Sequence, residues 1–493
     1  MTLSTPLAAR SPNTEAIPDP DVSLEGREIG EDDSSPFDAA YLEGVTEGLS
    51  APPREAEERV RAVPPQPFAL RGSVLTAIGA LRRAYVVVAN GVVHEVRTTR
   101  PAGVQVLDTD GVILPGLLDL HGHPEFNVFA AWEPPRRFSN RYLWRSHDLY
   151  QQLVRTPQNR LQTAVPPKTQ LRYAEVRALV GGVTAIQGAN ARIARTPDHE
   201  PLVRNVDLWV FGRHRARSLI DLPSSRSGFG WEKLSKVLGE IGRGEVDAFY
   251  LHLCEGRRDD QRSQTEWANF LELGAGTPAT VVIHGTALSA DQLEQLHALE
   301  CSLVWSPQSN LRLYDETTLA ADALRIGLPL ALGADWLPTG STSLLAEMQV
   351  ARRVLHEQGL DIGADRLVDM VTATAARISG LEQELGVLAA GRPADLVVLA
   401  RRHDDPYESV CLSDPGDVQL VCVGGDVTYG RRDWFDLLAA SATAPTIEDL
   451  TAWGRAMRLD TGYQARPGDT SPSLSELRAA LIGAYPQVGP VFA

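Results

Sequence analysis

Short apolar runs recur along the chain, and most are separated by stretches with helical spacing. In residues 231–242 and 290–300, apolar positions recur three and four residues apart, which is typical of amphipathic helices. Strands that alternate with helices in this way predict a parallel sheet covered on both faces. Seven runs from residue 112 onward read as its strands: VILPGLLDLHGH, GGVTAIQGAN, VDLWVFG, DAFYLHLCEG, TVVIHGTAL, CSLVWSPQSN and LPLALGADW.

An eighth, less clear strand is expected near ARSLIDL, residues 216–222. Eight strands suit an α/β fold of the (β/α)8 TIM-like barrel type, with an open parallel sheet as the alternative. On both sides of this region the pattern changes to β-branched runs separated by Gly and Asn turn signals, which predicts antiparallel strands. We therefore expect a small β-sandwich formed from the segments that flank the barrel.

This pattern predicts five segments along the chain. An acidic, Pro-rich arm comes first, then the first part of the sandwich, the barrel, the second part of the sandwich, and a helical tail. Their expected bounds are 1–66, 67–112, 113–385, 386–435 and 436–493.

Composition and charge limit the partners that the chain is expected to have. Of the net charge of −16, −10 comes from residues 1–60, which hold 14 acidic and 4 basic side chains. The 47 basic residues are scattered, which disfavours nucleic-acid binding, and no apolar run has the length of a membrane span. The four cysteines show no paired spacing, and the first residues lack a secretory pattern. We expect a cytoplasmic homo-oligomer that acts on a small molecule.

Candidate site residues lie at the ends of the predicted core strands. His121, His123, His252 and His284 each lie at or near the carboxyl end of an apolar run, and Asp335 ends another. One such histidine alone is more often a hydrogen-bonded core residue. Five such residues together point to one pocket, because the carboxyl ends of parallel barrel strands converge on a single face.

Imidazoles and one carboxylate, without cysteine at these positions, compose a site for zinc, with iron(II) as the alternative. In the His121-Gly122-His123 stretch, the alternation of a strand puts both imidazoles on the same face. Glu255 follows His252 by three residues and can exchange protons with a water bound to the metal. By itself Glu255 would be interpreted as a solvated loop glutamate.

At these residues the sequence resembles the amidohydrolase superfamily, in its deaminase-like, mononuclear branch. The stretch that leaves the barrel, residues 375–399, is also similar, and the resemblance covers about residues 67–435. The motifs that carry it are LPGLLDLHGH, HLCEG, VIHGTAL, WSPQSNLRL and LGADW.

The resemblance implies a role for each residue. It implies one divalent metal ion held by His121, His123, His252 and Asp335, with Glu255 as the proton shuttle. His284 would orient water or polarise the substrate, and Asp335 would also accept a proton. Relatives with two metals use a carboxylated lysine at the fourth strand, and none of the three lysines lies at such a position. This absence favours one metal.

The predicted function is metal-dependent hydrolysis, in which activated water attacks an sp2 carbon of a small molecule and a C–N bond is cleaved. A deaminase is expected first, and a cyclic-amide hydrolase or a chlorohydrolase-like enzyme is the alternative. A non-catalytic binding or assembly relative of the same fold is the alternative from another class. Serine-hydrolase, P-loop and zinc-protease helix motifs are absent from the sequence.

Tryptophans near these motifs are candidates for a flat pocket wall, although core packing is the commoner role for any one of them. The glutamine that many relatives carry after the first histidine pair is missing, and Glu125 or Asn127 could replace it. The candidate wall residues are Trp132, Trp144, Trp305 and Trp336.

Overall fold

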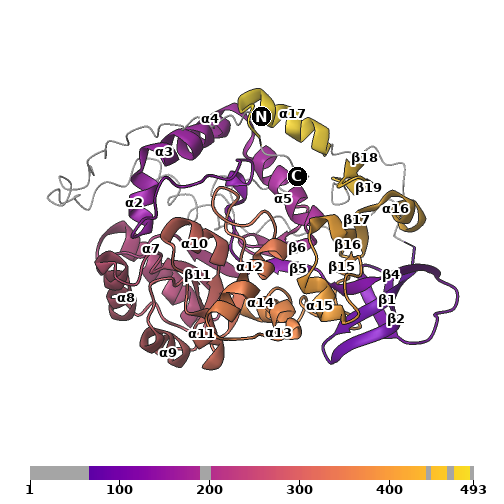
Figure 1. Cartoon of the computed structure of the whole chain (residues 1–493), viewed down its shortest axis with the longest axis horizontal. Helices are drawn as coiled ribbons and strands as arrows, with labels where there is room; N and C mark the ends of the chain where they lie inside the picture. The colour runs from indigo at the N-terminus through magenta and orange to yellow at the C-terminus, as the bar shows by residue number, and fades with distance from the viewer. Residues whose placement is uncertain (1–65, 189–200, 440–445, 463–470, 489–493) are drawn as a thin grey trace, which may run out of the picture.

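The computed structural model describes residues 66–188, 201–439, 446–462 and 471–488. It combines a large α/β part with a separate, mostly antiparallel sheet (Figure 1). The α/β class expected from the alternating pattern is thereby confirmed. No helix in these ranges is long and apolar enough to cross a membrane. The acidic arm that we predict for residues 1–66 lies almost wholly outside the described residues.

Eight short strands of the α/β part pair in parallel, five in one sheet and three in another. Every residue of the two central strands, β11 and β12, is buried, as a sheet covered on both faces requires. The five-stranded sheet has the order β10 (Ala216–Leu219), β11 (Ala248–Leu253), β12 (Thr280–His284), β13 (Ser302–Trp305) and β14 (Leu330–Leu332). The three-stranded sheet has the order β5 (Leu117–Asp119), β6 (Val183–Ile186) and β7 (Arg204–Asn205).

The two parallel sheets meet where β14 and β5 end. Gly122 and Asp335 form a parallel bridge. The backbone N–H of Asp335 donates to the carbonyl of His121 at 2.9 Å, and that of His123 donates to the carbonyl of Asp335 at 3.2 Å. The carboxylate of Asp119 accepts the N–H of Ala334 at 3.0 Å. These bonds place the first histidine pair beside the aspartate.

The strand predicted for residues 206–212 is wrong in detail. The residues that extend the parallel sheet are Arg204–Asn205, which pair with β6 just before the apolar run. The run itself forms β8 (Trp209–Val210), which pairs antiparallel with β9 (Arg213–His214). Phe211 and Gly212 at the end of this run both have positive φ angles. Such angles form a tight hairpin turn and would interrupt a longer strand. The expected strand near residues 216–222 is present as β10.

The separate sheet is built from both flanks of the α/β part. Its order is β18-β19-β17-β16-β15-β4-β1-β2-β3, and β15 pairs antiparallel with β4 to join the flanks. One pair differs from our expectation, because β1 and β4 run parallel. The strands are β1 (Phe68–Thr76), β2 (Gly79–Ala89), β3 (Val92–Arg97), β4 (Gln105–Pro115), β15 (Leu396–Leu399), β16 (Val418–Val423), β17 (Asp426–Arg431), β18 (Ile447–Ala452) and β19 (Arg455–Asp460).

Helices cover the parallel strands, and their ends follow from local capping. Ser289 and Gln292 form a reciprocal capping box at the start of α9, and Gly274 ends α8 in the left-handed conformation. The α-helices are α2 (Arg141–Ser146), α3 (Asp148–Tyr150), α4 (Thr156–Ala164), α5 (Pro167–Val180), α7 (Gly228–Gly242), α8 (Gln261–Leu273), α9 (Ala290–Ala298), α10 (Pro307–Tyr314), α11 (Ala320–Arg325), α12 (Leu344–Glu357), α13 (Ala364–Asp369), α14 (Ala373–Ile378), α15 (Pro406–Cys411), α16 (Arg432–Leu438) and α17 (Leu474–Ala484). Other helical segments are the 3-10 helices η2 (Pro124–Phe126) and η4 (Pro415–Asp417) and the π-helix η3 (Gln151–Arg155).

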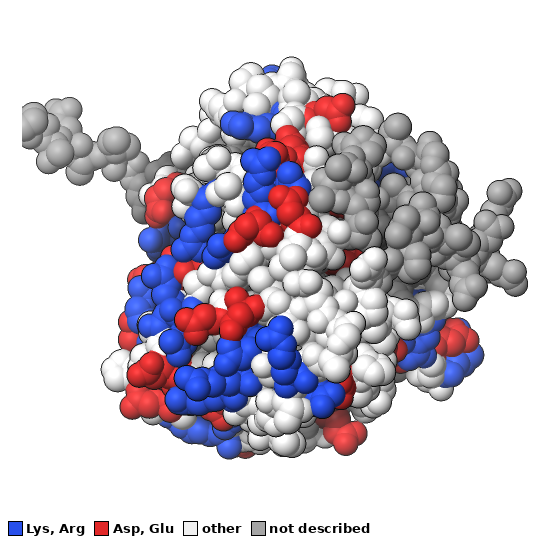
Figure 2. All heavy atoms as spheres, turned by 90° about the vertical axis from the view of Figure 1, so that its right-hand side faces the viewer, with Lys and Arg blue, Asp and Glu red and all other residues white. Residues whose placement is uncertain are grey.

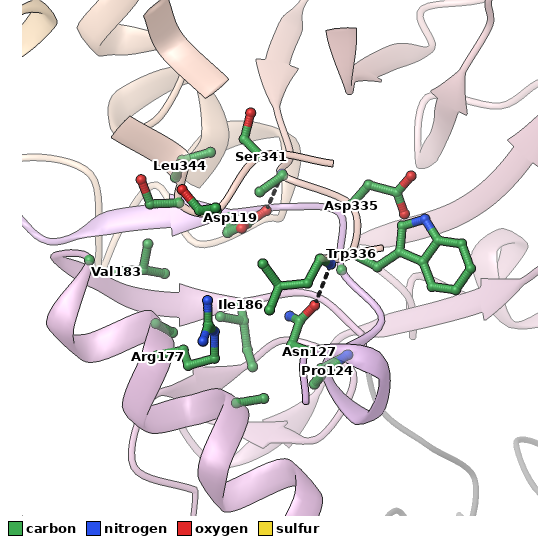
Figure 3. Close-up of a pocket in the computed structure, with 18 of the residues that line it drawn as sticks. Asp119, Pro124, Asn127, Arg177, Val183, Ile186, Asp335, Trp336, Ser341 and Leu344 are labelled. Carbon is green, nitrogen blue, oxygen red and sulfur yellow. Dashed lines mark hydrogen bonds between the residues drawn. The ribbon is translucent and has the colours of Figure 1, made fainter. Parts of the chain in front are cut away.

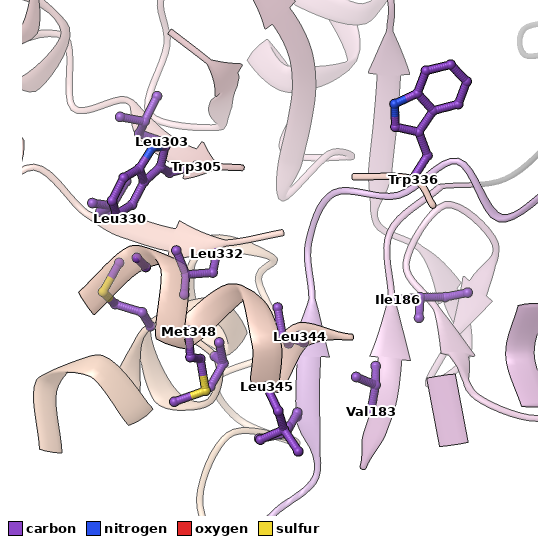
Figure 4. Packing of buried hydrophobic residues seen from close by; sticks show 14 of the residues in the cluster. Val183, Ile186, Leu303, Trp305, Leu330, Leu332, Trp336, Leu344, Leu345 and Met348 are labelled. Carbon is purple, nitrogen blue, oxygen red and sulfur yellow. The ribbon is translucent and has the colours of Figure 1, made fainter. Parts of the chain in front are cut away.

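The main core lies between the parallel strands and their helices (Figure 4). Leu303 of β13, Leu330 of β14 and Met348 of α12 are almost completely buried there. The α/β part is tied to the separate sheet by Arg204, whose guanidinium donates two hydrogen bonds to Asp395, at 2.7 and 2.8 Å.

The surface carries mixed charge on the face that includes α16, β18 and β19. Figure 2 shows basic and acidic side chains interleaved on that face. Arg431 pairs with Asp433 at 2.8 Å, and Arg458 pairs with Asp449 at 2.6 Å.

Candidate metal centre and active site

The four strand-end histidines and Asp335 lie together at the carboxyl ends of β5, β11, β12 and β14. The Nε2 atoms of His121 and His252 are 3.1 Å apart. The Oδ1 atom of Asp335 lies 3.5 Å from Nε2 of His121 and 3.6 Å from Nε2 of His123. The His284 ring is centred 4.7 Å from that of His121. Two overlapping sets of three could each hold one metal ion: His121, His252 and His284, or His121, His123 and Asp335.

Burial and mutual repulsion keep these imidazoles neutral. Burial lowers the pKa of His121 and His252 well below the usual range, and the neighbouring imidazoles lower it further. The same causes lower the pKa of His123 to about 4. A neutral imidazole has a lone pair on one nitrogen, which is the form that binds a metal.

Burial acts in the opposite direction on the carboxyl group, and it raises the pKa of Asp335 well above its usual range. A cation among these side chains would reverse that effect and hold Asp335 ionised. The donor set therefore fits a positive ion better than it fits an ion-free pocket.

Polar residues after β13 orient two of the imidazoles. Nδ1 of His121 lies 2.8 Å from Oγ of Ser306. Nδ1 of His284 lies 3.0 Å from Oδ1 of Asn310, whose amide nitrogen donates to Thr286. Because that bond directs the amide oxygen of Asn310 at His284, Nδ1 of His284 carries the proton and Nε2 keeps its lone pair. Ser306 and Asn310 lie in the WSPQSNLRL motif, but nothing in its residue pattern predicts these two contacts.

Glu255 lies beside His284 and is buried, with 5% exposure. Its Oε2 atom is 3.6 Å from Nε2 of His284. Its Oε1 atom accepts a hydrogen bond of 2.6 Å from the hydroxyl of Tyr314. The solvated loop glutamate considered in the sequence analysis is thus not what the fold contains. The carboxylate reaches this place because β11 ends at Leu253 and the chain turns sharply at Cys254.

Three positions at the site adopt backbone conformations that non-glycine residues rarely adopt. Cys254, His284 and Asp335 have φ angles of 51°, 66° and 63°. A left-handed conformation costs about 1–2 kcal/mol for a residue with a Cβ atom. Such strain concentrates at functional sites, where the surrounding structure enforces it.

Gly333 permits the close approach of β14 to the first histidine. A Cβ atom on Gly333 would lie 2.4 Å from Cβ of His121 and 2.7 Å from its backbone nitrogen. We expect Gly333→Ala to lower the free energy of unfolding by about 1–3 kcal/mol, because the backbone must move to relieve the overlap. Urea unfolding of the full chain measures this change. Gly483→Ala is the matched control, since no atom of the described residues lies within 4 Å of its Cβ position in α17. Equal stability of parent and Gly333→Ala would contradict the packing constraint.

Two of the four candidate tryptophans lie near the cluster. The Trp336 ring is centred 6.2 Å from His123, and the Trp144 ring is 5.5 Å from Trp336. Trp305 is completely buried and donates its indole N–H to Thr317. Trp132 packs on Phe138 and Tyr150. Trp144 and Trp336 therefore form an aromatic wall with Phe126 and Tyr150.

Arg141 is a buried basic residue near Glu255 that the sequence analysis missed. Burial alone would lower its pKa, but the carboxylates of Glu266 and Asp221 hold the pKa of Arg141 above its usual range. Its Nη2 atom lies 3.2 Å from each of these carboxylates. Its backbone N–H donates to the carbonyl of Glu255 at 3.1 Å. No sequence motif pointed to Arg141, because it lies outside the motifs that carry the family resemblance.

A cavity of about 60 Å³ lies beside the cluster, between α5 and the segment that leads into α12 (Figure 3). Asp119, Asn127, Arg177 and Ser341 are among the residues that line it. Burial raises the pKa of Asp119 to about 7. The side chain of Asn127 accepts the N–H of Leu337 at 2.9 Å, so it holds the segment after Asp335 in place.

The fourth parallel strand supplies no lysine to the cluster. β10 ends at Leu219, while Lys168 lies in α5 and Lys233 and Lys236 lie in α7. These are the only lysines in the sequence.

Comparisons with known proteins agree with this picture. Residues 232–428 match the model of the amidohydrolase family. A 5-methylthioadenosine/S-adenosylhomocysteine deaminase of Caldanaerobacter subterraneus is 27% identical over 200 residues, which are 37% of this chain and 46% of the relative. The chain thus spans about half the length of the curated relatives that it matches first.

Solved structures share the fold at low identity. An adenosine deaminase from Xanthomonas campestris with bound zinc superimposes with a TM-score of 0.59 and 16% identity, over 73% of this chain and 92% of that one. The atrazine chlorohydrolase of Arthrobacter aurescens complexed with zinc gives 0.55 and 18%, over 73% and 95%. These matches show that the chain is similar to amidohydrolases in part of its sequence and in its fold, and the histidine cluster lies at the ends of the matching strands.

Proposed function

We propose that the protein is a metal-dependent hydrolase that cleaves a C–N bond of a small molecule, with deamination as the first candidate reaction. The observation that carries this proposal is the convergence of the buried cluster with Glu255, whose Oε2 lies 3.6 Å from His284. A binding or assembly protein has no need of a buried carboxylate aimed at neutral imidazoles. The non-catalytic alternative is therefore less well supported.

We also propose that the eight parallel strands close into a (β/α)8 barrel. The parallel bridge between Gly122 and Asp335 supports closure at one junction of the two sheets. At the other junction, Ser218 of β10 donates to Asp207, which follows β7, at 2.7 Å. The five-segment layout, the homo-oligomer and the cytoplasmic location stay predictions.

The side chains fit one divalent ion, held by His121, His123, His252 and Asp335. Three neutral imidazoles and a carboxylate, taken from the two overlapping sets of three, are the ligand chemistry of zinc, with iron(II) as the alternative. The zinc in the two related structures supports zinc, and the position of the lysines supports a single ion. When bound, such an ion supplies Lewis acidity and lowers the pKa of a coordinated water to about 7.

The residues around the ion have separate roles in the proposed reaction. Oε2 of Glu255 takes a proton from the attacking water and delivers it to the leaving nitrogen. Nε2 of His284 lies 3.6 Å from Oε2 and keeps its lone pair, so it is placed to accept a hydrogen bond from the attacking water and to orient it. Asp335 accepts the second proton as the tetrahedral carbon collapses. The aromatic wall excludes water and stacks against a flat substrate.

The relatives suggest which leaving group to test first. The related deaminases are named for adenine-containing substrates, and the chlorohydrolase is named for a triazine. Glu125 is buried, and one of its carboxylate oxygens has no partner in the described part of the chain, so Glu125 could bind a ring nitrogen in place of the missing glutamine. A cyclic-amide hydrolase or chlorohydrolase-like activity is the alternative within the same chemistry.

The test is ammonia release by the zinc-loaded full chain from 5-methylthioadenosine, S-adenosylhomocysteine and adenosine, with chloride release from atrazine in parallel. Ammonia release that requires zinc is the expected result. Chloride release alone would favour the chlorohydrolase alternative. Release of neither product by fully loaded protein, extended to a set of cyclic amides, would favour the non-catalytic alternative.

A further inference from the structure

Trp144, Tyr314 and Glu255 form a buried chain of hydrogen bonds next to the proposed metal centre. The indole Nε1–H of Trp144 donates to the Tyr314 hydroxyl at 2.8 Å. That hydroxyl donates to Oε1 of Glu255 at 2.6 Å. Tyr314 is completely buried, while Trp144 and Glu255 are 8% and 5% exposed. The three residues come from α2, α10 and the turn after β11, which the fold must bring together.

The direction of this chain is fixed by chemistry. An indole nitrogen can only donate, so the Tyr314 oxygen must accept from Trp144. The single hydroxyl proton of Tyr314 is then left for Glu255, and Oε1 can only accept it. The distance of 2.6 Å lies in the normal range for a hydrogen bond between two oxygen atoms.

We propose that Trp144 and Tyr314 are positioning residues that reserve Oε1 of Glu255 as an acceptor and leave Oε2 as the oxygen that carries the proton. Oε2 is the atom that lies 3.6 Å from His284. This inference rests on the proposed function of Glu255 as proton carrier. Without the pair, the carboxylate could rotate and present either oxygen, so that a part of the molecules would hold the proton in an unproductive place.

The same chain connects the proton carrier to the aromatic wall. The Trp144 ring is centred 5.5 Å from Trp336 and 5.1 Å from Tyr150. The wall therefore has two roles in this proposal. Its faces contact the substrate, while the edge of one indole sets the orientation of the carboxylate through Tyr314.

The first test is Tyr314→Phe in the zinc-loaded full chain, with the substrate that releases ammonia most efficiently. Loss of a hydrogen bond to a charged acceptor should lower kcat about 10- to 100-fold. We expect KM within about threefold of the parent and unchanged zinc content, because Tyr314 contacts neither substrate nor metal. An unchanged kcat, or a fall in zinc content that accounts for the loss, would overturn the proposal.

Two other buried tyrosines serve as matched controls. Tyr250 and Tyr429 are completely buried, and their hydroxyls have no hydrogen-bond partner among the residues that the structure describes. Tyr250 lies in β11, two residues before His252. Tyr250→Phe and Tyr429→Phe should keep kcat within about twofold of the parent, because each removes a hydroxyl that makes no bond. A loss in these controls equal to that in Tyr314→Phe would mean that the effect is general to the core.

The second test is a double-mutant cycle. If Trp144 acts on Glu255 through Tyr314, Trp144→Phe should lower kcat in the parent but change it less than about twofold in the Tyr314→Phe background. Independent, multiplicative losses of kcat would show that Trp144 does not act through the tyrosine. Effects of Trp144→Phe on KM are expected in both backgrounds, since its ring belongs to the wall.

The third test does not depend on turnover. Neutron diffraction from deuterated, zinc-loaded crystals locates the exchanged protons directly. We expect a deuteron on Oη of Tyr314 that points to Oε1 of Glu255, and one on Nε1 of Trp144 that points to Tyr314. A deuteron on Oε1 would overturn the proposal. If no compound releases ammonia, the proposed function fails, and this measurement still decides the orientation of the chain.

Discussion

Replacing Glu255 with glutamine is expected to abolish turnover while the metal content stays near that of the parent. Glutamine has the same shape as glutamate, and its amide oxygen can still accept the hydrogen bond from Tyr314. Its nitrogen would then face His284 in place of Oε2, and it can neither take nor deliver a proton at neutral pH. General acid–base catalysis contributes about 100- to 10,000-fold, and we expect a loss of that size in kcat.

The measurements are ammonia release and zinc per chain on the same preparations. Glu294→Gln, on the exposed side of α9, makes the same chemical change away from the site and should behave as the parent. A fully active Glu255→Gln variant would remove Glu255 from the mechanism. Loss of zinc together with activity would instead mean that Glu255 supports the metal.

The convergence of the cluster was predictable because it follows from topology. Strands that run parallel end on the same side, so residues that end separate apolar runs are brought together whatever the intervening helices are. His252 and His284 are 32 positions apart in sequence, yet β11 and β12 are neighbours with Leu253 opposite His284. The character of the apolar runs alone predicted that both strands would be buried.

The strand of residues 206–212 was mispredicted because apolar character does not fix the pairing partner. A short apolar run can lie in a parallel sheet or in a tight hairpin, and both bury Val210. Likewise, β-branched runs joined by turns suggested antiparallel neighbours for β1 and β4. Because β2 and β3 lie between β1 and β4 in the chain, the chain can cross back and pair β4 in parallel with β1.

The residues that support the site were missed for a different reason. Tyr314 and Trp144 are 170 positions apart and carry no spacing signal, and a buried tyrosine or tryptophan is most often core. Their role depends on which polar atoms meet, which only the packed structure decides. Trp305 and Trp144 looked equivalent in sequence. In the fold, one bonds Thr317 within the core, and the other bonds the residue that holds Glu255.

Replacing His121 and His123 together with alanine is expected to remove the metal. Protein purified without chelator should hold about one zinc or iron ion per chain, because three or four protein ligands bind a single ion. His121 belongs to both possible ligand sets, and its Nε2 lies within 3.5 Å of both His252 and Asp335. Without both imidazoles, His252 and Asp335 cannot close a coordination sphere, so the ion content of the double variant should fall below about a tenth of the parent value.

Elemental analysis of parent and variant makes this measurement, and circular dichroism checks that the variant is folded. His297→Ala and His356→Ala remove histidines at the exposed ends of α9 and α12 and should leave the metal content unchanged. Two ions per parent chain would contradict the mononuclear proposal, because the lysines lie in α5 and α7 and another bridging ligand would be needed. A folded parent that binds no zinc even when zinc is supplied would contradict the proposed hydrolase function itself, since Glu255 alone cannot activate water strongly enough to attack a C–N bond.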